Sequence, residues 1–291
     1  MKNYIIVGDL HLKYKAPVFR KETYFEELKD KINQINFLAK MNNAKVVCLG
    51  DFFNNYVEDY FELISYELND MIYGWNSIIG NHDCKDSNGN LKGTSFGVLE
   101  RAGVIHVADF QDIDSYHYFE RNKFNGKSKK HNKIALIHDY IIPKGTKEFF
   151  DYRECFGNEY KIVFCGHYHY PFDVMVDGTR YINPGSLMRS TITELKLNRT
   201  PEVILIYPDT LEVRHIPLTV KPLSEVGNPV VENKLDSEFN SKFADMLVKN
   251  KLTGDNNDII GLLKTNNVDK DIVKYIEEKL KEVEKWLINN K

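Results

Sequence analysis

Cysteine is scarce in this sequence, and its spacing forms no recognisable pattern. The 291-residue chain has four cysteines, and no two of them form a C-x-x-C pair. Cys48 and Cys165 lie in apolar, strand-like runs, where cysteine is typically a small buried hydrophobic residue. The sequence therefore does not indicate a protein held together by disulfides.

Long apolar runs are also absent. No stretch approaches the ~20 apolar residues that a membrane-spanning helix needs. The N-terminus, MKNYIIVGDLH, has too short an apolar run for a secretory signal and is polar afterwards. We therefore expect a cytoplasmic protein that does not associate with membranes.

The chain also has no excess of positive charge. The formal net charge is −3, which argues against a surface that binds polyanions everywhere, although a local basic groove remains compatible with it. Hydrophobic residues make up 42% of the chain and charged residues 28%, which is ordinary for a globular protein with a sizeable core. The length suggests one large domain or two ordinary ones.

Strands and helices are expected to alternate through roughly the first 170 residues, which predicts an α/β domain. β-rich runs predict strands, and apolar residues at helical spacing predict helices. The expected strands are Tyr4–Val7, Lys45–Leu49, Asn76–Ile79, Ile134–Ile137 and Lys161–Cys165, and the expected helices are Glu22–Lys40 and Tyr60–Ile72.

Further along the chain, two hairpins are expected to complete the body. Phe172–Val176 and Thr179–Asn183 flank Asp177-Gly178, a dipeptide typical of a primed turn. Pro201–Tyr207 and Glu212–Leu218 form the second pair.

The predicted domain organisation is a catalytic domain over residues 1–220, a Pro- and Gly-containing linker over 221–235, and a helical C-terminal extension over 236–291. In the extension, Ile276, Leu280, Val283 and Leu287 are spaced to form one apolar seam on a helix. Such a helix either packs on its own domain or binds a partner.

Each expected strand of the first part ends in residues that can hold a metal ion. A Gly-Asp, a Gly-Asn or a His follows an apolar run five times, and the carboxyl ends of strands are where ligands gather in α/β sheets. A single instance would be an ordinary turn, but the repetition predicts a common site. The blocks are Gly8-Asp9-Leu10-His11, Gly50-Asp51, Gly80-Asn81-His82-Asp83, His138-Asp139 and Gly166-His167-Tyr168-His169.

The residue types in these blocks suit a pair of divalent cations. Carboxylate oxygen and imidazole nitrogen are ligands for Mn, Fe or Zn. Asp9, His11, Asp51, Asn81, His138, His167 and His169 supply seven such groups, too many for one ion. Asp51 is the natural shared ligand, because a carboxylate has two oxygens. Two cations ~3.5–4 Å apart can clamp a phosphate and activate a water between them.

The order D-x-H, G-D, G-N-H-D, H, G-H-x-H resembles the calcineurin-like metallophosphoesterase family over residues 1 to about 190. The resemblance implies a four-layer α/β/β/α sandwich, with two face-to-face sheets and helices outside. It also implies that Asp9, His11 and His169 hold one metal, that Asn81, His138 and His167 hold the other, and that Asp51 is shared. His82 would then be a general acid rather than a ligand.

Within the family, the chain is most similar to SbcD-like double-strand-break repair nucleases, which share the aspartate at the end of the G-N-H-D block. The resemblance implies a two-metal phosphodiester hydrolase that cuts DNA in repair or replication, with Mn as the first expectation and Fe, Zn or Mg as alternatives. It also implies an SbcC-like coiled-coil ATPase partner, bound through the C-terminal extension, and pairing of two copies. A small-molecule or cyclic-nucleotide phosphodiesterase and a phosphoprotein phosphatase are the alternatives, with a non-catalytic scaffold as a further one.

Three residues are weaker candidates for substrate binding. Asn54 stands where the family's protein phosphatases have an aspartate that orients the catalytic histidine, so it could orient His82 only as a neutral partner. Tyr168 lies within the G-H-x-H block and could stack on a base or sugar. Arg189 follows the Asn183-Pro184-Gly185-Ser186 block and could meet a phosphate, although a surface ion pair would explain it equally well.

Overall fold

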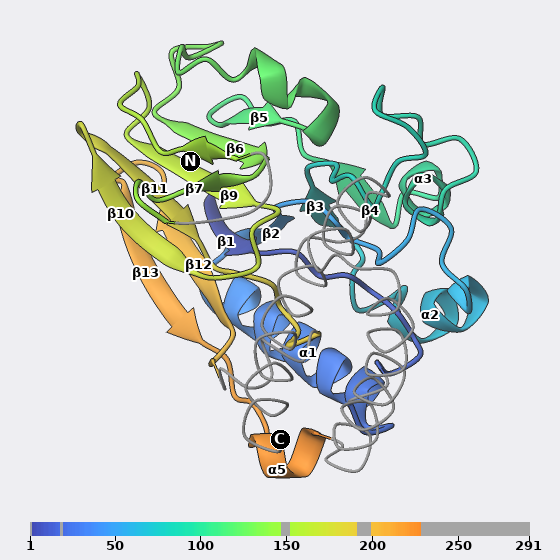
Figure 1. Ribbon diagram of the computed structural model, residues 1–291. Helices are drawn as coiled ribbons and strands as arrows, with labels where there is room; N and C mark the ends of the chain where they lie inside the picture. Colours follow the sequence, from blue (N-terminus) through green and yellow to red (C-terminus); the bar gives the residue numbers. More distant parts are fainter. Residues whose placement is uncertain (1, 18–19, 147–151, 191–198, 228–291) are drawn as a thin grey trace, which may run out of the picture. The chain divides into compact units, whose positions relative to one another are not determined.

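The structure is a computed structural model that describes residues 2–17, 20–146, 152–190 and 199–227. Its architecture consists of two large β-sheets with helices packed outside them (Figure 1), which confirms the predicted mixed α/β class. The expected C-terminal extension, with its apolar seam, lies outside the described residues. In the described ranges, no helix is long and apolar enough to cross a membrane.

The two sheets contain eleven strands, and their order is β13-β12-β1-β2-β3-β4 and β10-β11-β9-β6-β5. The first sheet contains β1 (Asn3–Val7), β2 (Ala44–Cys48), β3 (Trp75–Ser77), β4 (Ile105–Val107), β12 (Glu202–Tyr207) and β13 (Glu212–Pro217). The second contains β5 (Asp114–Tyr116), β6 (Ile134–His138), β9 (Ile162–Gly166), β10 (Phe172–Val176) and β11 (Thr179–Asn183). A small sheet pairs β7 (Ile141–Ile142) with β8 (Arg153–Glu154).

Five helices are described. They are α1 (Tyr24–Met41), α2 (Phe61–Leu68), α3 (Ser95–Arg101), the 3-10 helix η1 (Tyr118–Lys123) and α5 (Leu223–Val226). The expected helix at Tyr60–Ile72 is therefore shorter than predicted, since it ends at Leu68 and the chain turns through Asn69 toward β3.

The strands that were expected to carry functional residues run parallel. β1, β2, β3 and β4 pair in parallel in the first sheet, as do β5, β6 and β9 in the second. Parallel neighbours end at the same edge of a sheet, so the polar blocks that follow them are brought together. The 172–183 hairpin has its predicted turn, because Asp177 and Gly178 both have positive φ (47° and 85°).

Alternation along the strands separates three hydrophobic clusters. In β1, Ile6 faces the second sheet, whereas Ile5 and Val7 face α1. In β6, Leu136 lies between the sheets and Ile137 lies on the outer face. The core is therefore built from both faces of both sheets.

α1 covers the outer face of the first sheet (Figure 1). This helix, expected over Glu22–Lys40, buries one apolar face that contains Phe25, Leu28, Ile32, Ile35 and Ala39. The outer face of the second sheet is covered differently: within the described ranges, Phe124, Cys155 and Tyr160 from connecting segments pack on it, and no α-helix does. The described part of the chain thus shows the two sheets and one helical layer of the expected sandwich.

The first residues of the expected linker pack on the body of the protein. The Val226 side chain is fully buried, and the Val226 carbonyl accepts hydrogen bonds from the Lys21 backbone (3.0 Å) and the Arg20 side chain (3.3 Å). The remainder of the predicted linker, from residue 228, lies outside the described residues, so the predicted domain boundaries stay predictions.

His215 on β13 connects the edges of the two sheets. Its Nε2 lies 2.8 Å from Asp173 Oδ2 on β10, and its Nδ1 lies 2.9 Å from Glu202 Oε1 on β12. Partial burial opposes protonation, but the two carboxylates outweigh it and raise the pKa of His215. Arg180 also faces this group, through Asp173.

We expect His215 to make stability depend on pH. A raised pKa in the folded state means that the stabilisation is fully present below about pH 6.5 and is lost as pH rises through the folded pKa. His215→Gln should therefore lower the free energy of unfolding at pH 6, by about 1 kcal/mol or less because the group is partly exposed. The effect at pH 9 should be smaller. Thermal unfolding at both pH values measures this, with exposed His106→Gln on β4 as control. An equal effect at pH 6 and pH 9 would contradict the assignment.

Candidate metal centre

The predicted ligands all follow the carboxyl ends of parallel strands. Asp9 and His11 follow β1, Asp51 follows β2, and Asn81 follows β3 of the first sheet. His138 ends β6, and the pair His167 and His169 follows β9 of the second sheet. The two sheets therefore contribute to one site, which no single strand could build.

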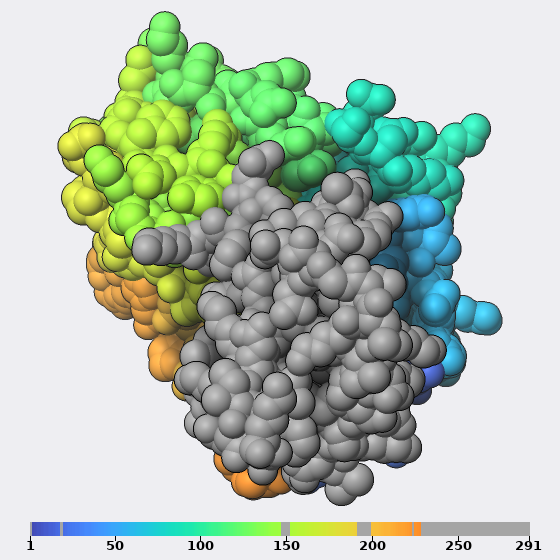
Figure 2. Space-filling view, viewed as in Figure 1, coloured from blue at the N-terminus to red at the C-terminus, as the bar shows by residue number. Residues whose placement is uncertain are grey.

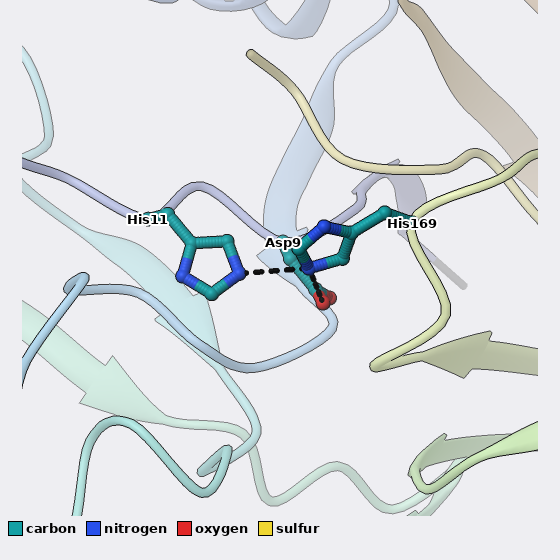
Figure 3. Close-up of side chains that lie close together, drawn as sticks. All are labelled: Asp9, His11 and His169. Atoms are coloured by element: carbon teal, nitrogen blue, oxygen red, sulfur yellow. Dashed lines mark hydrogen bonds and ion pairs between the residues drawn. The ribbon is translucent and has the colours of Figure 1, made fainter. Parts of the chain in front are cut away.

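One ligand group joins Asp9, His11 and His169 (Figure 3). The Nε2 atoms of His11 and His169 face each other at 2.9 Å, and His169 Nε2 lies 3.5 Å from Asp9 Oδ2. Asp9 and His11 are buried, while the His169 side chain is 27% exposed. Two ring nitrogens and a carboxylate that converge in this way could hold a metal ion.

A second ligand group joins Asp51, His138 and His167. His138 Nε2 lies 3.4 Å from Asp51 Oδ1 and 3.0 Å from the side-chain oxygen of Asn81, so Asn81 belongs to the same group. His138 Nδ1 lies 2.7 Å from the Leu49 carbonyl, which only accepts hydrogen bonds. Nδ1 therefore carries a proton, and Nε2 is the atom presented to the site.

Asp51 connects the two groups. Its Oδ1 faces His138, as above, and its Oδ2 lies 3.8 Å from His11 Nε2. Oδ2 is buried and has no hydrogen-bond partner in the structure. A buried carboxylate oxygen without a donor is costly unless a cation satisfies it, so this orphaned atom fits a metal ion.

Burial and mutual charge shift the pKa values of the groups in the site in opposite directions. Burial raises the pKa of Asp9 to about 8, and Asp51 adds to this although His138 opposes it. Burial also disfavours ionised Asp51 and protonated His138, but their mutual attraction wins, so the pKa of Asp51 lies well below its usual value and that of His138 rises to about 10. Burial lowers the pKa of His11 and brings that of His167 to about 3, leaving neutral imidazoles, the form that binds metals.

Three of the predicted ligands have strained backbones. His11, Asp51 and His167 adopt positive φ values of 47°, 46° and 78°, a region that costs residues with a side chain ~1–3 kcal/mol each. Hydrogen bonds hold these positions: His11 N donates to the Asp51 carbonyl (2.9 Å), and His167 N donates to the Asp9 carboxylate (3.0 Å). Strain that the surroundings maintain is typical of functional sites.

Gly80 allows the β3 loop to approach Asp51. A Cβ at this position would overlap both the carboxylate and the backbone nitrogen of Asp51. The same loop is held by Asp83, whose buried carboxylate accepts hydrogen bonds from Phe53 N (3.1 Å) and Gly80 N (2.9 Å). The sequence placed Asp83 in the G-N-H-D block without a role, and the structure shows that it joins the loops after β2 and β3.

The Asn183-Pro184-Gly185-Ser186 block makes hydrogen bonds to the backbone of the loops that carry the predicted ligands. Asn183 Nδ2 donates to the Tyr168 carbonyl (2.5 Å), and Ser186 N donates to the His169 carbonyl (3.2 Å). The next residue, Leu187, donates its backbone N–H to the Asp9 carbonyl (2.8 Å). The block therefore supports ligand loops from both sheets.

His82 lies at the mouth of the site, with 41% of its side chain exposed. Its Nε2 is 4.0 Å from Asp51 Oδ2, and its backbone N–H donates to Asp51 Oδ1 (2.9 Å). Its Nδ1 lies 2.6 Å from the backbone carbonyl of Asn54. Because a carbonyl only accepts, Nδ1 carries a proton, and Nε2 is the atom available for proton transfer.

The contact that orients His82 thus differs from the one that the sequence suggested. The Asn54 side chain was the expected neutral partner, but its Oδ1 accepts a hydrogen bond from Lys13 Nζ (3.2 Å), and the backbone carbonyl makes the contact instead. Any residue type has that carbonyl, so the residue type at position 54 could not reveal this contact.

The two other weak candidates differ in accessibility. Tyr168 is half-buried; its ring centroid lies 5.4 Å from that of Tyr140, which is itself 5.4 Å from the His167 ring. Arg189 is fully buried, where it donates to the Lys221 carbonyl (2.8 Å) and lies 3.8 Å from Glu27. A guanidinium with no exposed surface does not reach a substrate in this structure, which corrects the suggestion of a phosphate contact for Arg189.

Sequence reasoning missed one aromatic neighbour of the site. The Tyr118 ring, on η1, lies 6.1 Å from the His138 ring and 6.0 Å from the His167 ring, measured between centroids. Tyr118 comes two residues after β5, a strand that the sequence analysis did not predict, and it belongs to no motif, so no local pattern marked it.

The fold and the ligand groups fit a metal-dependent hydrolase, and comparison with known sequences gives its class. The calcineurin-like phosphoesterase superfamily domain matches residues 2–200. The chain belongs to this superfamily. No curated protein matches it.

Several solved structures match part of the chain. An archaeal phosphodiesterase is 15% identical, with a TM-score of 0.38, and the match covers 74% of this chain and 99% of that one. A hypothetical protein from Pyrococcus horikoshii OT3 is also 15% identical, with a TM-score of 0.38, over 82% of this chain and 94% of that one. A Vps29 mutant from Entamoeba histolytica has 15% identity and a TM-score of 0.30, over 75% and 99%. At such identities and TM-scores these matches carry no inference about this chain.

Proposed function

We propose that the chain is a two-metal phosphodiester hydrolase that cuts DNA, a nuclease of the SbcD-like kind acting in repair or replication. The observation that carries the two-metal part is Asp51, a single buried carboxylate whose two oxygens face different ligand groups. Half-buried tyrosines beside the second group, Tyr118, Tyr140 and Tyr168, support a substrate with flat organic groups such as nucleobases.

Each ligand has a proposed task. Asp9, His11 and His169 hold one ion, Asn81, His138 and His167 hold the other, and Asp51 binds both. Two bound divalent cations would polarise the phosphoryl oxygens and lower the pKa of a water between them toward neutrality. Mn is the proposed metal, with Fe, Zn or Mg as alternatives.

The protein's own proton donor is His82. The Asn54 carbonyl fixes Nδ1–H, and this leaves Nε2 to carry the transferable proton. Its exposed position at the mouth of the site lets Nε2 reach the leaving oxygen of a bound ester, opposite the attacking water. Its Nε2 faces the site, 4.0 Å from Asp51 Oδ2.

Labelled DNA tests this function directly. The purified chain is incubated with single- and double-stranded DNA, with Mn²⁺ and with a chelator, beside bis(p-nitrophenyl) phosphate and a phosphopeptide. Mn-dependent DNA cleavage supports a nuclease. Cleavage of the chromogenic diester without any DNA cleavage would instead favour a small-molecule phosphodiesterase, and activity on the phosphopeptide alone would favour a protein phosphatase. No hydrolysis at all, with no metal retained, would favour a scaffold.

Partners of the proposed nuclease stay predictions. The SbcC-like ATPase would bind the C-terminal extension, which lies outside the described residues. Pairing of two copies was implied by the resemblance without an assigned surface, and α2 is one helix with exposed apolar residues, Leu63 and Tyr66 (42% and 89%). Sedimentation of the full chain tests the pairing.

A further inference from the structure

The short helix η1 is anchored at the second ligand group. The backbone N–H of Tyr118 donates to the Ile79 carbonyl (2.9 Å), and Ile79 N donates to His117 Nδ1 (3.0 Å). Ile79 directly precedes the Gly80-Asn81-His82 loop. η1 is therefore connected to the loop that carries a predicted ligand and the predicted proton donor, and the green segment around it reaches the surface in Figure 2.

The Arg121 guanidinium lies over the Tyr118 ring, which contacts the predicted ligands His138 and His167. Arg121 Cζ lies 4.0 Å from the Tyr118 ring centroid, and Arg121 Nη1 donates to the Tyr118 carbonyl (2.9 Å). The other neighbours of the Tyr118 ring are His138 and His167, at about 6 Å as given above. The Tyr118 ring therefore lies between the Arg121 guanidinium and the second ligand group. The cation–π contact with this ring holds the guanidinium in place.

Neighbouring carboxylates are engaged by other cations. Arg153 binds Asp139 Oδ2 through Nε (2.7 Å) and Nη2, whereas Arg121 Nε lies 4.0 Å from Asp139 Oδ1, beyond hydrogen-bond distance. Glu120 lies 3.0 Å from Lys123 Nζ and 3.9 Å from Lys129 Nζ. The positive charges here outnumber the negative ones, and the Arg121 side chain, 29% exposed, is the weakly paired one.

We propose that Arg121, held by Tyr118, binds a second phosphate group of the substrate, next to the phosphate at the metal centre. This inference rests on the proposed phosphodiesterase function and gives its substrate class, esters that carry at least two phosphates, as successive nucleotides of a strand do. An arginine suits this task because its planar fork donates to phosphate oxygens in pairs.

Calorimetric titration of the full chain, loaded with Mn²⁺, tests the subsite without turnover. The probes are thymidine 3′,5′-bisphosphate and thymidine 5′-monophosphate. The wild type should bind the bisphosphate roughly 10-fold or more tightly than the monophosphate, the usual worth of hydrogen bonds to a charged group. Arg121→Gln should remove that preference and leave the monophosphate affinity unchanged. Arg101→Gln on α3 is the matched control and should change neither.

Tyr118 variants show whether the stacked ring positions the guanidinium. Tyr118→Phe keeps the ring and should keep the preference for the bisphosphate. Tyr118→Leu should lose most of it, and combining Tyr118→Leu with Arg121→Gln should add little further loss, because both changes remove the same contact.

The proposal is overturned if the wild type binds both probes equally or binds neither, or if Arg121→Gln weakens both to the same extent. These outcomes are separable from failure of the proposed function, which shows as absent hydrolysis of every ester in the DNA and chromogenic assays. A chain that hydrolyses both DNA and the chromogenic diester, yet does not prefer the bisphosphate, keeps its function and loses the subsite.

Discussion

Asp51→Ala is expected to lose both metal ions and to lower phosphodiester hydrolysis about 10³-fold or more, in the range of losing a central charge-stabilising group. Its two oxygens face His11 and His138 at 3.8 and 3.4 Å, so one substitution removes a ligand from each group. It also removes the acceptor for the His82 backbone N–H, which would loosen the proton donor. Elemental analysis of metal per chain, after purification with Mn²⁺, is the primary measurement.

The control for Asp51 is Asp59→Ala, an exposed aspartate farther along the same loop, which should retain metal and activity. Asp51→Asn keeps the side-chain volume but replaces one oxygen with a donor, and should also lose metal. Full Mn-dependent turnover by Asp51→Ala, with two ions still bound, would rule out a shared aspartate.

His82→Ala should leave the metal content nearly intact while activity falls ~10²-fold or more, the usual range for a general acid. His82 also lies in a possible ligand group with His11 and Asp51, but we expect the other ligands to hold the metals without it. Because 41% of its side chain is exposed, its removal should not unfold the chain. Metal analysis and kcat measured on one preparation separate the two effects.

Two substrates with different leaving groups test whether His82 donates a proton. A sugar alkoxide needs a proton more than p-nitrophenolate does, so the loss of activity in His82→Ala should be larger for DNA than for bis(p-nitrophenyl) phosphate. His131→Ala, at an exposed loop position, is the control and should affect neither substrate. Loss of the metals in His82→Ala would instead make His82 a ligand, and equal losses on both substrates would argue against proton donation.

The strand-end blocks were predictable because their chemistry is local. A short apolar run followed by glycine and a polar residue specifies a buried strand and a turn at its end, whatever the rest of the chain does. The helical stripe from Phe25 to Ala39 and the turn at Asp177-Gly178 were predictable for the same reason. Periodicity and turn chemistry need only neighbouring residues.

Contacts made by the backbone were not predictable from residue types. Asn54 orients His82 through its carbonyl, while its side chain bonds to Lys13. Arg189 looked like a surface cation beside a motif, yet it is buried against Glu27 and the Lys221 carbonyl. Both outcomes depend on which segments distant in sequence pack together.

The sequence by itself determined which groups can bind metal and that they follow successive strands, since ligand chemistry and strand periodicity are properties of short segments. Only the tertiary structure decided that the two sheets bring Asp9, His11 and His169 together and that each Asp51 oxygen faces a different group. It also decided that Tyr118, with Arg121 over its ring, lies beside His167. The physical reason is that these contacts join residues more than a hundred positions apart in several cases, and the packing of both sheets around a shared core sets their distances.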